Sequence, residues 1–226
     1  MNAVIERPIL MSGESVRGII DLRKTHTRRV IKPQPKKSII YANSEDCWIT
    51  KGEMFFSWNK SWKCLYGKPG DLLWVRETWD AISKTDEFSP LEECNIEYRA
   101  DLPAGCTDYP GGWLMEDARG NDEATRWRPS IFMPRWASRI TLKIRDVRVE
   151  RLQDISEADA EKEGISNLDS YIQAAKFGHR DDHGALITKS KTLFAGYWDS
   201  INAKRGHSWD SNPWVWVIEF EKVEGK

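Results

Sequence analysis

The sequence predicts an α+β protein built around a small curled sheet or barrel. Short runs in which apolar and polar residues alternate, as they do in strands, are spread along the whole chain. Helical spacing follows the first of these runs and returns in the last third, where a final strand closes the chain. Periodicity alone does not separate a barrel from a sandwich.

A helix cap and two prolines mark the boundaries of the first predicted strands and helix. Residues 7–12 (RPILMS) have strand character, and Ser12 is a suitable N-cap for a short amphipathic helix over residues 13–24. Lys24 to Thr27 then lie at the turn into a second strand over residues 28–32. The two prolines that follow stop regular structure.

The remaining elements are predicted in the same way. Ser156 is the expected N-cap of an acidic helix that Gly164 ends. Two more helices are expected over residues 168–176 and 188–204. Further strands are expected at 46–50, at 53–58, after the turn in 66–79, at 95–101, in the second half of 126–152 and at 214–223.

Charge is segregated along the chain, although the formal net charge of the 226 residues is only −1. The net charge is +7 over residues 1–76, −10 over 77–125, +5 over 126–150 and −3 over 151–226. The acidic block falls in a stretch, about 78–130, that is poor in periodicity and rich in Gly and Pro. We expect one domain over 1–226 with this stretch as an acidic insertion. A solvated loop is the simpler account of it, and docking onto the protein's own basic face or onto a basic partner are the alternatives.

Composition also bears on location and cofactors. No apolar run approaches the roughly 20 residues that span a bilayer, and the N-terminal segment lacks the basic start and apolar stretch of a signal peptide. We therefore expect a cytoplasmic protein with no membrane partner. The four cysteines form no CxxC pair and are expected to be free thiols. His179 and His183 share a helical spacing, but flanking glycines favour a polar loop, so we expect no metal and no cofactor.

Four motifs occur in an order that resembles a known family. Residues 18–29 (GIIDLRKTHTRR) resemble the K-T-x-T-x-R signature of ASCH domains, which are a branch of the PUA-like β-barrels. Residues 67–77 (GKPGDLLWVRE) resemble the family's G-D-x-L-x-V strand, and residues 152–165 (LQDISEADAEKEGI) its E-G helix. Residues 214–220 (WVWVIEF) resemble its closing strand. The blocks 126–140 and 212–220 are also similar to the longer ASCH proteins of phages and prophages.

This resemblance implies a small PUA-like barrel with flanking helices and a cleft for a nucleoside or an exposed base. In small bacterial members that are N4-acetylcytidine amidohydrolases, a lysine, a threonine and a glutamate of these motifs are catalytic, which here implies Lys24, Thr27 and Glu163. Thr27 would attack the amide, Lys24 would accept its proton, and Glu163 would protonate the leaving nitrogen. The alternative is structural: Lys24 and Thr27 cap the first helix, and Glu163 is a solvated carboxylate.

Basic and aromatic residues supply candidate contacts to a nucleic acid. Arg28 and Arg29, together with Lys32, Lys36 and Lys37, have the charge to neutralise phosphates. Tryptophans interleaved with arginines near residues 126–139 suit unpaired bases, unless the tryptophans are core and the arginines pair with the acidic insertion. The candidate substrate-binding residues are Arg28, Arg29, Arg76, Arg126, Trp127, Arg128, Arg135 and Trp136.

The sequence thus predicts an ASCH-type protein that recognises a modified nucleoside or an exposed base in RNA. As an enzyme it would hydrolyse an N-acyl cytosine amide such as N4-acetylcytidine. The alternatives are a non-catalytic RNA- or DNA-binding module and a phage accessory protein that acts through protein contacts. Turnover lost in Thr27→Ala separates enzyme from binder, and salt-dependent affinity for nucleic acid separates binder from accessory protein.

Overall fold

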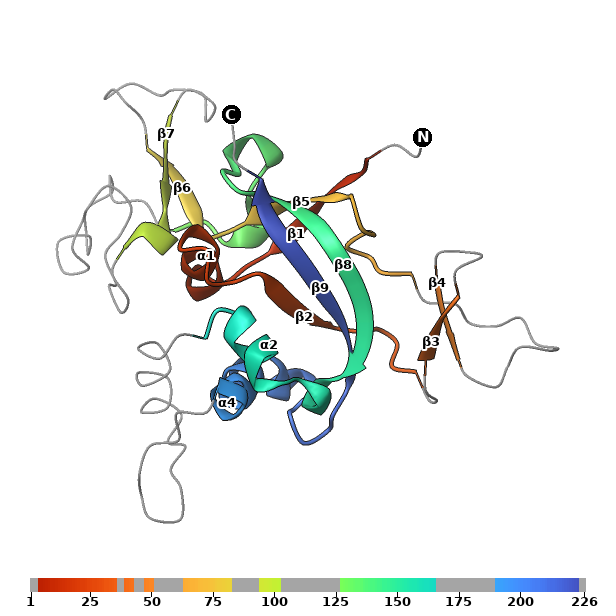
Figure 1. The fold of residues 1–226 in the computed structure, drawn as a ribbon. Coiled ribbons are helices and arrows are strands. Elements are labelled where there is room, and N and C mark those ends of the chain that lie inside the picture. The colour runs from red at the N-terminus through yellow and green to blue at the C-terminus, as the bar shows by residue number, and fades with distance from the viewer. Residues whose placement is uncertain are drawn as a thin grey trace, which may run out of the picture.

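The computed structural model describes residues 4–35, 39–42, 47–50, 63–82, 94–102, 127–165 and 190–223 (Figure 1). These residues form a mixed α+β structure. In chain order the elements are β1 (Glu6–Leu10), α1 (Gly13–Ile20), β2 (His26–Val30), β3 (Ile39–Ala42), β4 (Cys47–Thr50), β5 (Leu72–Arg76), β6 (Trp79–Ile82), β7 (Asn95–Tyr98), β8 (Thr141–Arg151), α2 (Glu157–Lys162), α4 (Ser190–Asn202) and β9 (Trp214–Val223). Short 3-10 helices include Ser130–Phe132, Arg135–Ala137 and Ala203–Arg205.

Five strands form the main sheet, in the order β1-β5-β8-β9-β2. β1 is parallel to β5, and the other neighbours are antiparallel. The long pair β8 and β9 contains a register shift between Ile144 and Asp146. Such a bulge bends a strand and increases its twist, and β8 curves strongly in Figure 1. Among the strands that the structure describes, β1 and β2 remain the two edges of this sheet, which is therefore curled but not closed.

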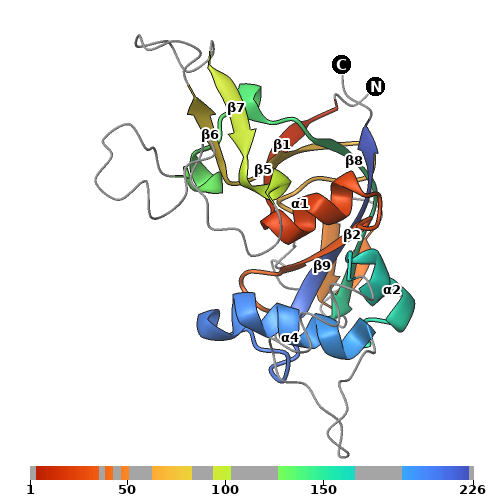
Figure 2. The same ribbon diagram turned by 90° about the vertical axis from the view of Figure 1, so that its left-hand side faces the viewer.

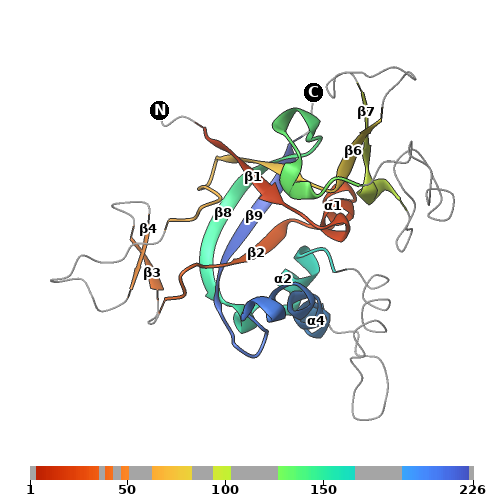
Figure 3. The ribbon, with the colours of Figure 1, turned by 180° about the vertical axis from the view of Figure 1, so that it is seen from behind.

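The helices pack on both faces of the curled sheet. Figure 2 shows β2 running between α1 and α4, and the opposite view in Figure 3 agrees. The main core joins α1 to the sheet and includes Val16 and Ile19. A second core joins α2 and α4 to the sheet and includes Phe194. Strand β9 contributes alternate residues to both cores, because Trp216 belongs to the first and Val217 to the second. Burial on both faces explains the nearly continuous apolar run of this strand.

Both predicted N-caps are confirmed. The Ser12 hydroxyl accepts from the Ser15 N–H at 3.2 Å, and the Ser156 hydroxyl accepts from the Asp159 N–H at 3.0 Å. The first helix nevertheless ends at Ile20, four residues before the predicted end. Leu22 adopts a left-handed conformation (φ 58°), which a right-handed helix does not accommodate.

Part of the stretch expected to be an insertion is packed. β6 and β7 pair as antiparallel strands, although the sequence predicted only the second of them. Trp79 and Ala81 of β6 form a small third core with Met133 and Ala137. Most of the acidic block lies outside the described residues, as do the segments expected to form a strand at 53–58 and a helix at 168–176.

Among the described residues no helix combines the length and apolar character that a membrane span requires. Nor does this part of the chain contain three or more His, Cys, Asp or Glu residues grouped as metal ligands. His179 and His183 lie outside the described residues. Cys64 carries a free thiol, and burial raises its pKa to about 11.

Candidate functional site

Two segments far apart in the sequence meet where α2 ends. An isolated antiparallel bridge pairs Lys24 with Glu163, and the Thr25 N–H donates to the Lys162 carbonyl at 2.8 Å. The Lys24 ammonium donates to the backbone carbonyl and to the carboxylate Oε2 of Glu163, at 2.7 Å each. The two side chains are only 2% and 5% exposed, so they form a buried ion pair. Removal of the Glu163 carboxylate would leave Lys24 as an uncompensated buried charge.

Glycines allow this close approach. Gly164 has φ +88°, the left-handed conformation that commonly ends a helix. A Cβ on Gly164 would lie 2.9 Å from the Lys24 Cβ, and a Cβ on Gly18 of α1 would lie 3.2 Å from the same atom. Lys24 is thus held between α1 and the end of α2 because neither neighbour carries a side chain there.

Arg28 holds the other oxygen of the Glu163 carboxylate. Its Nη1 donates to Glu163 Oε1 at 3.2 Å, while its Nη2 donates to Glu150 at 3.2 Å and to Asp159 at 3.4 Å. Arg148 contacts the same two acids at 2.5 and 2.9 Å. The network therefore joins Lys24, Arg28 and Arg148 to the carboxylates of Glu150, Asp159 and Glu163, and Lys162 lies at its edge, 4.0 Å from Asp159. Arg28 has a fully buried side chain, and its charge is balanced within the protein.

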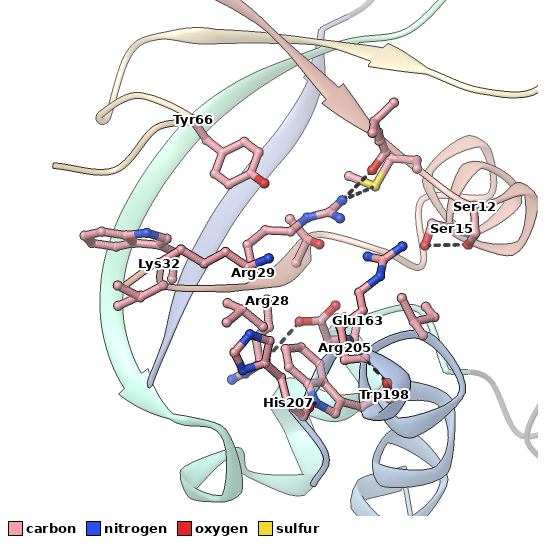
Figure 4. A pocket seen from close by; sticks show the side chains of 18 of the residues that line it. Ser12, Ser15, Arg28, Arg29, Lys32, Tyr66, Glu163, Trp198, Arg205 and His207 are labelled. Carbon is pink, nitrogen blue, oxygen red and sulfur yellow. Dashed lines mark hydrogen bonds and ion pairs between the residues drawn. The ribbon is translucent and has the colours of Figure 1, made fainter. Parts of the chain in front are cut away.

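A cavity of about 690 Å³ opens beside this network (Figure 4). All three residues predicted to be catalytic, Lys24, Thr27 and Glu163, line it. Its size falls within the range of about 300–1,000 Å³ that small-molecule sites occupy. Thr27 is almost completely buried, and within the described part of the chain its hydroxyl has no hydrogen-bond partner. That hydroxyl is therefore available to a ligand.

Other residues of the wall carry no motif and were not predicted. The hydroxyl groups of Ser12 and Ser15 lie 3.0 and 3.3 Å from the hydroxyl of Tyr197 in α4. Aromatic rings of Tyr66 and Trp198 also line the cavity. The helical spacing of residues 188–204 predicted that α4 is a helix. That spacing does not indicate which of its residues line a cavity. The helices and the loop before β5 meet there only in the folded chain.

Arg29, like Lys32, is a predicted phosphate contact that lines the cavity without a carboxylate partner among the described residues. It donates to the Leu10 carbonyl at 2.6 Å and to the Met11 sulfur at 3.3 Å, and its guanidinium lies 5.9 Å from the Tyr66 ring centroid. Figure 4 shows its side chain beside Tyr66. Lys32, Lys63 and Arg205 are further cations of the cavity wall.

Those of the other predicted substrate-binding residues that the structure describes are not in the cavity wall. Arg128 pairs with Asp80 at 2.7 Å. Arg135 pairs with Glu6, also at 2.7 Å. Trp136 packs edge-on against Trp79, with ring centroids 5.9 Å apart, yet remains 44% exposed. The remaining members are Arg76, whose guanidinium donates to the Ile131 carbonyl and lies 5.4 Å from the Trp74 ring, the half-buried Trp127, and Arg126, which lies outside the described residues.

His26 lies between the two threonines of the K-T-x-T segment but does not line the cavity. It is 3% exposed, and burial lowers its pKa because the charged imidazolium is poorly solvated there. The Glu219 carboxylate, 3.6 Å from Nε2, acts in the opposite direction but is itself 43% exposed. The imidazole is therefore neutral at pH 7 and is held by Thr25, whose hydroxyl lies 3.0 Å from Nδ1.

Comparisons of this chain with protein-family models, with curated proteins and with solved structures found no match. No relative therefore assigns a role to the cavity, and its function has to follow from the chemistry of its own residues.

Proposed function

We propose that the protein is an ASCH-type, PUA-like domain whose cavity binds a cytosine nucleoside with an N4-acyl group and hydrolyses the amide. One observation carries the proposal: Lys24, Thr27 and Glu163 line the same cavity, although 139 positions separate Lys24 from Glu163. The curled five-stranded sheet, with a helix after β1 and helices before β9, is compatible with such a domain. The hydroxyl, amine and carboxyl groups are the types that amide hydrolysis uses.

The contact between Lys24 and Glu163 is central to the proposed chemistry. One proton that moves along their 2.7 Å hydrogen bond converts the ion pair into a neutral amine and a carboxylic acid. The amine then accepts the proton of the Thr27 hydroxyl as its oxygen bonds to the acyl carbon. The carbon–nitrogen bond breaks as Glu163 gives its proton to the departing N4 amine. This leaves cytidine, an acyl ester on Thr27, and the original ion pair.

Water completes the cycle. A water molecule attacks the ester carbon and gives a proton to the Glu163 carboxylate. The ester bond to Thr27 then breaks, and the threonine oxygen recovers a proton from Lys24. A final proton transfer from Glu163 to Lys24 restores the ion pair. The net reaction consumes one water and releases a carboxylic acid and an amine, so atoms and charge balance.

A binding module without turnover is the second candidate, and the same ion pair favours it. Lys24 donates two hydrogen bonds to Glu163, one to the backbone and one to the carboxylate, so it is held as a cation rather than as a base. In that case the cavity would recognise the base while Thr27 supplies a hydrogen bond.

The test is incubation of the purified protein with N4-acetylcytidine, with cytidine and acetate measured by chromatography. We expect release from the wild type, none above background from Thr27→Ala, and a fall in kcat of about 10²–10⁴-fold for Lys24→Ala and Glu163→Gln. Thr25→Ala is the matched control, because this neighbouring threonine does not line the cavity. Its rate should stay close to that of the wild type.

Circular dichroism would establish that each variant is folded. Absence of release from the folded wild type would exclude this amidohydrolase. An equal loss of activity in Thr25→Ala and Thr27→Ala would show that the two threonines support the structure of the segment and that Thr27 is not the nucleophile. Binding of the acetylated nucleoside without turnover would favour the binding module.

A further inference from the structure

The cavity wall carries positive charge that the proposed hydrolysis does not use. Four cations line it in addition to Lys24 and Arg28: Arg29, Lys32, Lys63 and Arg205. Within the described ranges none of the four has a carboxylate partner, whereas Lys24 and Arg28 are balanced by the buried acids. Glu163 is the one acidic residue among those that line the cavity. Apart from Lys24 and Arg28, which the buried acids balance, the wall therefore carries four positive charges that no described carboxylate offsets.

These four cations come from separate parts of the fold. Arg29 lies in β2, and Lys32 follows that strand. Lys63 lies in the loop before β5, and Arg205 ends the 3-10 helix Ala203–Arg205 after α4. Figure 4 shows Arg29 and Lys32 on one side of the cavity and Arg205 reaching into it from the other. Like charges around one volume repel each other unless an anion lies between them.

From this arrangement we infer that the ligand of this cavity carries a phosphate, so that its substrate class is a nucleotide and not a free nucleoside. The identity of the base rests on the proposed function, but the need for an anion does not. Two of the cations are arginines, whose planar guanidinium groups match phosphate oxygens in pairs. Arg205 is exposed and has no described hydrogen-bond partner, so its guanidinium is free to bind an anion. The phosphate of a mononucleotide and that of an RNA strand would satisfy the same groups.

Binding of the unmodified products tests the inference without any turnover. Isothermal titration at low salt would compare cytidine 5′-monophosphate with cytidine. We expect the monophosphate to bind at least about tenfold more tightly, because hydrogen bonds between charged groups are the stronger ones. Arg205→Gln should reduce the affinity for the monophosphate about tenfold or more and leave the affinity for cytidine unchanged. Lys204→Gln is the matched control, because it removes an adjacent exposed charge outside the cavity.

The outcomes separate this inference from the proposed hydrolysis. A monophosphate that binds no better than cytidine, or absence of binding by both, overturns it. So does an equal loss in Arg205→Gln and Lys204→Gln. Arg205-dependent binding of the monophosphate without hydrolysis of its N4-acetyl form would sustain the inference while the hydrolysis fails. Hydrolysis of N4-acetylcytidine and its 5′-phosphate at equal kcat/KM would support the proposed hydrolysis and overturn the inference that the ligand carries a phosphate.

A third arm identifies the source of the phosphate. A short cytidine-containing oligoribonucleotide would be titrated beside the monophosphate. Tighter binding of the oligonucleotide, with the same dependence on Arg205, supports the inference with an RNA strand as ligand. Tighter binding of the monophosphate supports it with a free nucleotide.

Discussion

The two oxygens of the Glu163 carboxylate are held by different cations, Oε2 by Lys24 and Oε1 by Arg28. The two cations are not equivalent. Arg28 also contacts Glu150 and Asp159, whereas Glu163 is the one ion-pair partner of Lys24 among the described residues. Loss of the carboxylate would therefore leave Lys24 buried without a counter-ion. Loss of Lys24 would leave Glu163 still paired with Arg28.

This asymmetry predicts unequal stabilities. We expect Glu163→Leu to lower the free energy of unfolding by about 3–5 kcal/mol, the usual cost of a buried charge without its partner. Lys24→Met should cost less, and the double variant should be more stable than Glu163→Leu alone because no unpaired lysine remains. Urea denaturation of the three variants measures all of these differences. A Lys24→Met variant as unstable as Glu163→Leu would contradict the account.

His26 predicts a pH dependence of stability. Its pKa in the folded protein is lowered by burial from about 6.5, so the unfolded chain binds the proton more readily. The stability that the neutral imidazole contributes is complete above about pH 6.5 and is lost as the pH falls below that value. Urea midpoints measured between pH 7.5 and pH 5 should decline in the wild type and decline less in His26→Gln. Parallel profiles for the two proteins would exclude His26 as the source.

At the scale of elements, the sequence predicted those features that depend only on residues within the same segment. The caps at Ser12 and Ser156 and the final strand were predictable because a hydroxyl or a run of β-branched residues acts on its own segment. Strand β6 was missed because its four residues include a buried Asp80, which is 1% exposed and accepts a hydrogen bond from Arg128. An acid buried through a distant arginine has no signature in the periodicity.

Gly164 joins two elements and provides a test at this scale. Gly164→Ala would impose a left-handed conformation on a residue with a Cβ and place that atom 2.9 Å from the Lys24 Cβ. We expect a loss of at least about 2 kcal/mol of stability, from backbone strain together with overpacking. Gly206→Ala is the matched control, because Gly206 also has a positive φ (+79°) but nothing within 4 Å of an added Cβ. It should lose only about 1 kcal/mol.

The comparison of Gly164→Ala with Gly206→Ala separates the cost of a positive φ from the cost of the close contact with Lys24. Thermal unfolding of both variants gives the difference in stability, and hydrolysis or nucleotide binding reports on the position of Lys24. Only Gly164→Ala should change both properties. Equal stability losses in the two variants would mean that the close approach to Lys24 is unimportant.

At the scale of the whole molecule, the sequence showed two basic blocks. It did not show which of them has arginines and lysines free to bind a nucleic acid. The motifs predicted Lys24, Thr27 and Glu163 as members of one site, because each lies in a recognisable segment. Whether an arginine is free to bind a ligand depends on acids from elsewhere in the fold. Arg128 is neutralised by Asp80 and Arg135 by Glu6, whereas the four cavity cations have no such partner within the described part of the chain. Pairing of this kind exists only after folding.

This difference predicts which face a single-stranded RNA would contact. Each phosphate contact to a single strand contributes about −0.7 to the slope of log K against log salt concentration, because counterions are released. Arg205→Gln should therefore make the slope less steep by about 0.7. Arg135→Gln should change it less, because Glu6 lies 2.7 Å from that guanidinium and already offsets its charge. Fluorescence anisotropy of a labelled oligoribonucleotide over a series of salt concentrations gives both slopes. A larger change in Arg135→Gln would move the RNA from the cavity to the surface of interleaved arginines and tryptophans, where the sequence alone had placed most of the candidate contacts.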